Sequence, residues 1–155
     1  MPVHVSLLAD EPAAIEHVAR LRWREWGHAP EPEDLQFWLE TSTREAGRDD
    51  IPVTFVALDG ADVVGAVGLD EFDIDERHDT SPWITGTIVR PDARERGVGR
   101  ALMSSVEQWA AQHGIQEAWV ATEIAADFYR KCGWTYLETI ERVGDDVHVL
   151  HKRFS

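Results

Sequence analysis

Residues 83–102 read WITGTIVRPDARERGVGRAL, and this stretch decides the fold. Its β-branched and apolar start predicts a strand from Trp83 to Val89. Apolar residues then recur at helical spacing, which predicts a helix over 98–113 that ends before Gly114. A strand, a turn with two glycines and a helix N-terminus together form an anion site, because the first helical N–H groups lack internal partners. The alternative interpretation is an ordinary tight strand-to-helix turn with solvated arginines.

Charge is distributed unevenly along the chain. The sequence carries 15 basic and 29 acidic side chains, a net charge of −14. Such a surface repels nucleic acid and anionic membranes and suits a cationic partner, although solubility alone explains it equally well. The segment 90–100 is a local exception that would attract a polyanion. It holds four arginines: Arg90, Arg94, Arg96 and Arg100.

The length of 155 residues predicts one domain over residues 1–155. At 43% hydrophobic and 28% charged residues, the composition is that of an ordinary globular protein. No apolar run reaches the length of a membrane helix and no signal sequence opens the chain, which predicts a cytoplasmic protein. The single cysteine, Cys132, excludes an internal disulfide and is expected in the core.

The rest of the chain alternates short strands and helices without a repeat or a dividing linker. The order is one strand, two helices, three strands, a helix, a strand, a helix and two strands, with turn signals at Asp59-Gly60 and Gly144-Asp145. This order predicts an α/β fold. The expected elements are strand 3–8, helices 12–26 and 32–45, strands 53–58, 63–69 and 83–89, helix 98–113, strand 116–122, helix 123–132, and strands 135–143 and 147–154.

Two motifs and the element order resemble the GNAT superfamily of N-acetyltransferases. The string Arg94-x-x-Gly97-x-Gly99 is similar to that family's acyl-CoA pyrophosphate loop, Gln/Arg-x-x-Gly-x-Gly/Ala. Residues 125–134, AADFYRKCGW, are similar to its Ala-x-x-Phe-Tyr-x-Lys-x-Gly-Phe signature. The loop lacks the Gly-Lys-Ser/Thr ending of a nucleotide P-loop. The resemblance covers nearly the whole chain and implies the acyl-CoA N-acyltransferase (GNAT) architecture, a mixed, mainly antiparallel sheet flanked by helices.

The resemblance also implies acetyl-CoA as the co-substrate and no metal. Loop N–H groups and arginines would hold the pyrophosphate, and backbone groups of the fourth strand would bind the pantetheine arm and polarise the thioester. Thr122 stands where the family often has an asparagine, so that contact is weakened or made by a hydroxyl. The implied cofactor-binding residues are Ile88, Val89, Arg94, Glu95, Arg96, Gly97, Val98, Gly99, Arg100, Thr122, Phe128, Tyr129 and Lys131.

Two residues are predicted to be catalytic by this resemblance. Tyr129 matches the family tyrosine that faces the leaving sulfur, where a hydrogen bond is favoured over full proton transfer because a tyrosine is a weaker acid than a thiol. Many family members place a carboxylate base on the fourth strand, but residues 83–89 contain none. Glu71 is therefore the predicted base. The alternatives are Asp70, Glu123 and His78.

Other candidate groups have ordinary explanations. His148 and His151 form His-x-x-His, but on a strand they face opposite sides, so no metal site is expected. Trp26, Trp38 and Trp83 fall near segments that border the acceptor groove in the family fold, where they could stack on an aromatic or cationic substrate. Core packing is the default explanation for all three.

These observations predict an acetyl-CoA-dependent N-acetyltransferase that moves an acetyl group to a primary amine by direct attack. The acceptor is expected to be a cationic small-molecule or peptide amine, with no nucleic acid or membrane partner. A homodimer stays open, as does transfer of another acyl group. The competing hypothesis from another class is a catalytically silent acyl-CoA-binding module, a sensor or regulator, with the same fold.

Overall fold

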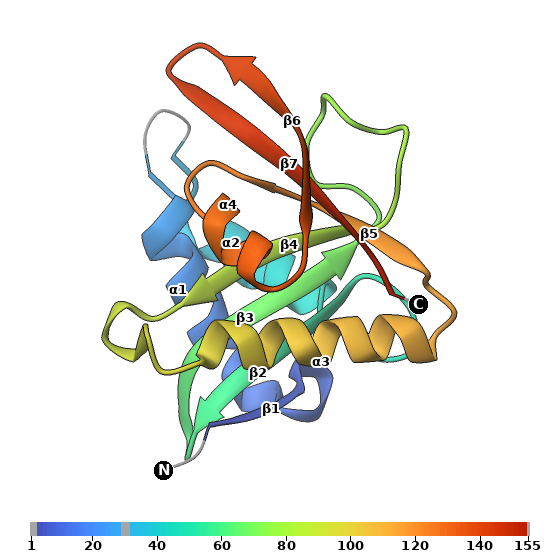
Figure 1. Cartoon of the computed structure of the whole chain (residues 1–155). Coiled ribbons are helices and arrows are strands. Elements are labelled where there is room, and N and C mark those ends of the chain that lie inside the picture. Colours follow the sequence, from blue (N-terminus) through green and yellow to red (C-terminus); the bar gives the residue numbers. More distant parts are fainter. Residues whose placement is uncertain (1–2, 29–31, 155) are drawn as a thin grey trace.

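The computed structural model describes residues 3–28 and 32–154, and a seven-stranded sheet forms its centre (Figure 1). The strand order is β1-β2-β3-β4-β5-β7-β6, and every neighbouring pair is antiparallel except β4 and β5. The strands are β1 His4–Leu7, β2 Val53–Asp59, β3 Asp62–Asp70, β4 Trp83–Val89, β5 Glu117–Thr122, β6 Thr135–Arg142 and β7 Asp145–Arg153.

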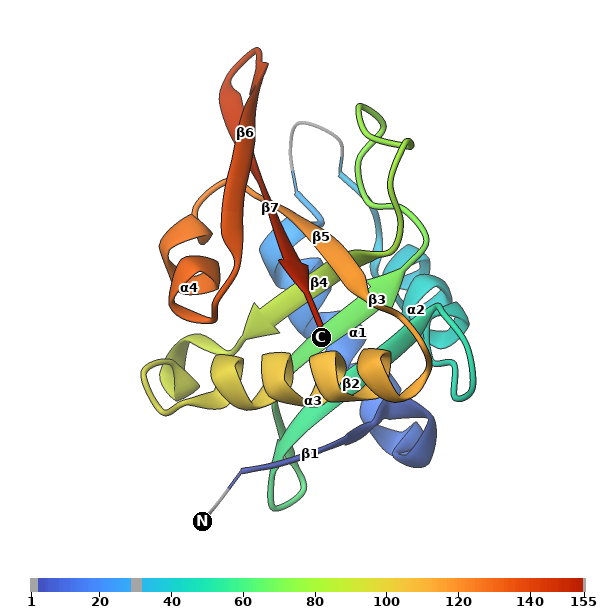
Figure 2. The same cartoon turned by 45° about the vertical axis from the view of Figure 1, so that its right-hand side comes forward.

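Helices cover both faces of the sheet. Helix α3 crosses one face, and α1 and α2 lie against the other (Figures 1 and 2). The helices are α1 Ile15–Trp26, α2 Leu35–Arg44, α3 Val98–Gln112 and α4 Ala126–Lys131. Among the described residues, no helix has the length and apolar character needed to cross a membrane. The mixed, mainly antiparallel sheet and the predicted order of strands and helices are confirmed.

The central strands are buried because both faces of the sheet are covered. All residues of β2 but the last are buried, and so are residues 63–69 of β3. On one face Leu102 and Val106 of α3 pack into the larger apolar cluster, and on the other Val18 of α1 packs into the smaller one. Each of these side chains is fully buried, a contribution of about 1.5–3 kcal/mol per side chain to the stability of the fold.

Three helices begin later than the sequence predicts. The first starts at Ile15 rather than residue 12, because residues 8–10 and 12–14 form two 3-10 turns. The second starts at Leu35 rather than 32, because Asp34 caps it by accepting the Phe37 N–H at 2.9 Å. The fourth starts at Ala126 rather than 123, after a turn in which the Thr122 hydroxyl accepts the Ala125 N–H. The predicted connection through residues 29–31 lies outside the described part of the chain.

Strands β4 and β5 separate soon after they begin. Their parallel pairing consists of Trp83 with Trp119 and Ile84 with Val120. In the pairing with β3, β4 gains one residue between Thr85 and Ile88, a bulge at which Gly86 has a φ of +55°. Among the described strands, none pairs with the β5-facing side of residues 85–89, so an open edge runs through the middle of the sheet.

Candidate active site

The loop between β4 and α3 folds back sharply before the helix begins. Glu95 has a φ of +65° and Gly97 a φ of +80°, so the backbone turns through the left-handed region twice within three residues. Apart from Gly97 itself and its two chain neighbours, no described residue has an atom within 4 Å of the point where a Cβ of Gly97 would stand. The loop therefore leaves open space directly above the start of α3.

The N-terminus of α3 keeps its hydrogen-bond donors free. The first backbone bond of the helix runs from the Ala101 N–H to the Gly97 carbonyl at 3.0 Å, and no side chain caps the helix. Within the described residues, the N–H groups of Val98, Gly99 and Arg100 meet no acceptor. These donors and the helix dipole point toward the open space, an arrangement that suits a phosphate.

The four arginines of this segment are not equally available. Arg90 pairs with Asp92, and Arg96 pairs with Asp59 at 3.1 Å. Arg94 donates from Nε to the Val89 carbonyl at 3.2 Å and forms no ion pair with a described residue. The fourth, at position 100, is exposed and has no ion-pair or hydrogen-bond partner in the described part of the chain. Of the four arginines in the predicted basic region, Arg94 and Arg100 are therefore the two that form no ion pair with a described residue.

The second motif lies against the first. A Cβ at Gly99 would stand 2.9 Å from the Phe128 ring, so the first turn of α3 packs directly on α4. Tyr129 follows Phe128 and is only 3% exposed, whereas Lys131 lies on the exposed side of α4. Thr122 precedes α4, and its hydroxyl accepts the Ala125 N–H at 2.9 Å. The predicted cofactor residues of α3 and α4 therefore share one region, with Lys131 turned to solvent.

Tyr129 combines a buried ring with a hydroxyl that lies next to Thr87 of β4. Phe128 and Trp134 pack edge-on against the ring, at centroid distances of 5.1 and 6.1 Å. The hydroxyl forms no hydrogen bond of ordinary geometry with a described residue. Burial raises the pKa of Tyr129 to about 12, the nearby Thr87 hydroxyl opposes the rise, and the negative charge of Asp73 adds to it. The phenol stays protonated at neutral pH and therefore has a proton with which to donate a hydrogen bond.

The predicted backbone positions of β4 lie along its open edge. Ile88 is 7% exposed and packs into the cluster with α1, whereas Val89 packs against the cluster with α3. Their side chains are therefore core. Because successive residues of a strand direct their backbone groups to opposite edges, only one of the two faces the open edge, and the Val89 carbonyl accepts from Arg94 Nε at 3.2 Å. Arg90, which directly follows β4, donates its N–H to the Val64 carbonyl of β3 at 2.8 Å.

A buried arginine supports the bulge of β4, and the sequence interpretation did not select it. Arg22 is 2% exposed, and its guanidinium would contact a Cβ at Gly86, 2.8 Å from Nη2. Nη1 donates to Glu45 at 3.2 Å, while Nε, Nη2 and the buried Thr87 hydroxyl have no partner within the described residues. Burial lowers the pKa of Arg22 and raises that of Glu45, and their mutual attraction opposes both shifts. The available signal was the position of Arg22 four residues after Val18, on the apolar face of the first helix.

The predicted base, Glu71, lies at the end of β3. It is exposed; its N–H donates to the Asp70 carboxylate at 2.6 Å and its carbonyl accepts the Ser81 hydroxyl at 2.8 Å. Glu123 is exposed too, and a hydrogen bond with Asp145 is the main cause of its raised pKa. His78, the remaining alternative, stacks on a phenylalanine at residue 72 with a centroid distance of 4.4 Å.

An acidic hollow lies beside these candidates, and it contains a carboxylate that the sequence interpretation missed. Asp73 keeps an exposed face toward the hollow, but desolvation by the surrounding protein raises its pKa to about 6. The charges of Glu45 and Asp70 add to the rise, and Arg142 opposes it. The sequence showed six carboxylates between residues 70 and 79 but no spacing that singled out one. The hollow has a volume of about 460 Å³ and is lined by Asp73, Ile74, Asp75, Glu76 and Arg142.

The histidines and tryptophans take ordinary places. Within residues 3–28 and 32–154, no group of three or more potential metal ligands occurs. His148 bonds Thr139 and His151 bonds Glu117, on opposite sides of β7. Trp83 is fully buried and donates to the carbonyl of residue 80, as core packing predicts. Trp26, by contrast, is 41% exposed and packs beside the indole of residue 38 on the face formed by α1 and α2.

Several solved acetyltransferase structures share this fold over its whole length. An aminoglycoside 6'-N-acetyltransferase complexed with coenzyme A matches with a TM-score of 0.79 at 14% identity, covering 100% of this chain and 98% of that one. The Salmonella typhimurium protein yncA, with its cofactor acetyl-CoA, matches with a TM-score of 0.70 at 14% identity, with coverages of 100% and 95%. Spermidine/spermine N-acetyltransferase SpeG from Vibrio cholerae gives a TM-score of 0.69 at 17% identity, with coverages of 98% and 92%. At such identities the likeness establishes the fold.

The family is established by the sequence itself. No curated protein matches the chain at a significant level. The family model described as acetyltransferase (GNAT) family matches residues 15–134, which include the loop before α3, the open edge of β4 and Tyr129. This match spans well over half of the chain. The chain therefore belongs to the acetyltransferase (GNAT) family of N-acetyltransferases.

Proposed function

We propose that the protein transfers the acetyl group of acetyl-CoA to a primary amine of a cationic small molecule or peptide. The observation that carries this proposal is the open edge of β4, which lies between the free N–H groups of α3 and the Tyr129 hydroxyl next to Thr87. A long ligand with phosphates at one end and a reactive group at the other fits such a path. Bound acetyl-CoA would supply an activated thioester carbonyl and a sulfur leaving group.

The loop and the start of α3 would bind the pyrophosphate. The free N–H groups of residues 98–100 can donate to phosphate oxygens, and the open space at Gly97 allows close approach. Arg94 and Arg100 would add charge, since neither forms an ion pair with a described carboxylate. Gly99 keeps α3 against Phe128 and thereby sets the position of these donors relative to α4.

The backbone of β4 and the side chain of Tyr129 on α4 would act on the thioester. As the resemblance implies, the backbone at Ile88 and Val89 would bind the pantetheine amides and donate toward the developing oxyanion, where preorganised donors are most effective. The Val89 carbonyl already accepts from Arg94 Nε, so the ligand would share or displace that bond. Tyr129 would donate a hydrogen bond to the departing sulfur. Thr122 and Lys131 would contact the cofactor at the outer side of α4.

We propose a cationic acceptor because the hollow that would receive it is acidic. Carboxylates surround the hollow beside β3 and β6, and the chain as a whole carries a net charge of −14. The names of two similar structures, aminoglycoside and spermidine/spermine N-acetyltransferases, also describe enzymes for amines. Glu71, next to the hollow at the end of β3, remains the base proposed from the sequence. Residues 1–155 would act as a single cytoplasmic domain without nucleic acid, membrane or metal, and a homodimer stays open.

The second candidate function is a silent acyl-CoA-binding module. The observation in its favour is that β4, where many family members carry their base, offers only Thr85 and Thr87 as polar side chains. Such a module would bind acetyl-CoA at the same loop but would not turn it over.

A screen of amines separates the two functions. Acetyl-CoA binding is measured by calorimetry, and CoA release is measured with a panel that includes spermidine, an aminoglycoside, amino acids and lysine-containing peptides. The proposed enzyme binds acetyl-CoA and releases CoA faster with at least one amine than without any. Binding with no amine-dependent release would establish the silent module, and the absence of binding would exclude both functions.

A further inference from the structure

We propose that Asp73, in the hollow between the β3–β4 loop and β6, is the base that takes the proton from the acceptor's ammonium group. This inference rests on the proposed function, because it assigns a residue to one step of that reaction. It replaces Glu71, the base that the sequence favours, with a residue two positions further along the same loop.

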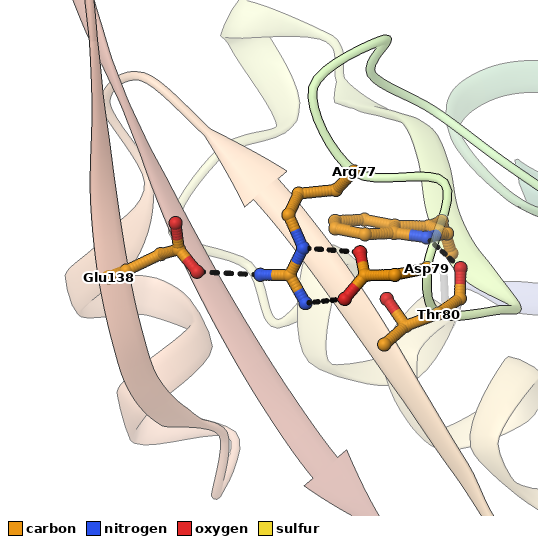
Figure 3. Close-up of polar contacts among 5 residues, drawn as sticks. Arg77, Asp79, Thr80 and Glu138 are labelled. Carbon is orange, nitrogen blue, oxygen red and sulfur yellow. Dashed lines mark hydrogen bonds and ion pairs between the residues drawn. The ribbon is translucent and has the colours of Figure 1, made fainter.

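The β3–β4 loop, residues 71–82, is tied to the β6–β7 hairpin by ion pairs on either side of Asp73's hollow. Arg142 of β6 holds Glu76 through two hydrogen bonds of 2.7 and 2.8 Å. Arg77 of the loop bonds Glu138 of β6 at 2.6 Å and also holds Asp79 (Figure 3). Loop and hairpin rise above the same end of the sheet in both views (Figures 1 and 2). The position of Asp73 is therefore set by neighbours on two elements, as a base requires.

Charged groups from several elements surround this carboxylate. Glu45 follows α2, Asp70 ends β3 and Arg142 belongs to β6; the first two repel the charge of Asp73 and the third attracts it. Tyr129 of α4 responds to the same charge. The excess of negative charge attracts an ammonium ion, and desolvation raises the pKa of Asp73 to about 6. A base with that pKa is ionised at pH 7 and still has useful proton affinity.

Polar groups without partners indicate where the substrate would lie. Arg22 is 2% exposed, and two of its guanidinium nitrogens have no partner in the described part of the chain. Tyr129 is 3% exposed, and its hydroxyl lies next to the Thr87 hydroxyl of β4. Arg22 lies against Gly86 at the β4 bulge, and the Thr87 hydroxyl beside it is also unpartnered. Deeply buried polar groups are rarely left unsatisfied unless a ligand uses them. Arg22 adjoins Gly86 and Tyr129 adjoins Thr87, so both lie next to the bulged part of β4, and the charge of Asp73 acts on Tyr129 there.

The proton transfers balance without any further reactant. The Asp73 carboxylate takes one proton from R–NH3+, which leaves a neutral amine with a free electron pair. That pair forms the C–N bond to the thioester carbonyl as the C–S bond breaks, and the second proton lost by nitrogen ends on the sulfur. Asp73 then releases its proton to water, so that one proton appears in solution for each acetyl group transferred.

Position and environment favour Asp73 over Glu71. Both carboxylates have an exposed face, but of the two only Asp73 lines the hollow, and the charge of Asp73 also acts on Tyr129. The main chain of Glu71 is engaged with Asp70 and Ser81.

The first test follows the carboxylate directly and needs no acceptor. Protein labelled with 13C at the aspartate carboxyls is titrated by NMR, and the Asp73 signal is identified by its absence in Asp73→Asn. A midpoint near pH 6 is expected, and a midpoint near 4, the ordinary value of an aspartate, would overturn the inference. Because the folded-state pKa is raised, Asp73→Asn should melt above wild type at pH 7, and the difference should shrink as the pH falls and vanish below about pH 3, where the aspartate is protonated in both the folded and the unfolded state. This comparison also shows that the variant folds.

The second test uses the pH profile of kcat/KM with the best amine from the screen. For wild type, kcat/KM should rise tenfold per pH unit up to about pH 6 and then level off. Asp73→Asn should lose about 100-fold or more at pH 7 and then regain about tenfold per pH unit, because the neutral amine becomes more abundant in solution. Asp73→Glu should restore both the rise of kcat/KM with pH and the plateau at higher pH.

Two further variants complete this test. Asp62→Asn, the same change at the far end of β3, should keep the wild-type profile. A wild-type profile in Asp73→Asn, or the predicted loss in Glu71→Gln instead, would show that Asp73 is not the base while leaving the proposed function intact. Failure of the wild type to turn over any amine would refute the proposed function itself.

Discussion

At the scale of single residues, the protonation state of Tyr129 limits its role. With a pKa of about 12, the phenol is a far weaker acid than a thiol near ~8.5, so transfer of its proton to a thiolate is uphill by roughly 5 kcal/mol. The hydroxyl can still stabilise negative charge on the departing sulfur by donating a hydrogen bond in a desolvated site. Tyr129 therefore acts, in this account, through hydrogen bonding and not as a general acid.

The first prediction removes that hydrogen bond. Tyr129→Phe should lower kcat about 10- to 100-fold, because a donor aimed at developing charge is lost, and should leave the Kd of acetyl-CoA nearly unchanged. Steady-state kinetics and calorimetry measure both quantities. Tyr136→Phe is the matched control: its hydroxyl already bonds Thr139 at 2.6 Å on the exposed hairpin, so kcat should change little. An unchanged kcat in Tyr129→Phe would remove the residue from the reaction.

Residues within one short motif could be predicted from the sequence, and residues that meet only through the fold could not. Gly97, Gly99 and Tyr129 belong to contiguous patterns, although their roles came from resemblance. Arg22 and Asp73 lie 51 positions apart and gain their environment from different helices and strands. Desolvation depends on neighbours that are distant in sequence, so no local spacing reveals it.

At the scale of elements, the β3–β4 loop and the β6–β7 hairpin meet at a junction that borders the acidic hollow proposed for the acceptor. Arg77 is central to it, since one guanidinium bonds Asp79 within the loop and Glu138 on β6 (Figure 3). These bonds raise the pKa of Arg77 and lower that of Asp79, so their contact persists until the pH falls low enough to protonate the carboxylate. The junction connects two segments more than 60 residues apart, Arg142 with Glu76 among them.

The second prediction concerns the order of this loop. Arg77→Gln should increase amide hydrogen exchange in residues 71–82 and raise the KM for the acceptor, because the loop loses its tie to β6. Arg20→Gln is the control, as it removes an exposed pair within α1 and should leave exchange in the loop unchanged. Equal exchange in Arg77→Gln and wild type would show that the ion pair does not order the loop.

Element order was predictable, and element boundaries were less so. Alternating β-branched runs and hairpin turns located the strands within a few residues. The helix starts shifted because local hydrogen bonds decide them: Asp34 caps α2 and the Thr122 hydroxyl holds the turn before α4. The separation of β4 and β5 was predicted only from the family resemblance, because no residue in either strand indicates where their pairing ends.

At the scale of the whole molecule, the two substrates would meet opposite charges. The α3 end of the open edge carries Arg94 and Arg100 with free backbone donors, whereas the hollow beside β6 carries carboxylates. An anionic cofactor and the proposed cationic acceptor would thereby be attracted to different ends of the same edge. The chain has 29 acidic and 15 basic side chains, so most of its surface would attract a cationic acceptor and repel an anionic cofactor. The α3 end, with Arg94 and Arg100, is where the anionic cofactor would be attracted.

The most direct test of this account is thermal melting with and without acetyl-CoA for wild type, Gly97→Glu and Gly114→Glu. The two glycines have φ values of +80° and +76° and open space around the Cβ position, so both variants bear similar strain and the same new charge, at opposite ends of α3. At about 100 times its Kd, a ligand adds about 2.7 kcal/mol to stability, a rise of several degrees in Tm. Wild type and Gly114→Glu should show that rise, and folded Gly97→Glu should show none. No shift in wild type at millimolar acetyl-CoA, or an equal shift in Gly97→Glu, would contradict the assignment of the loop before α3 as the cofactor site.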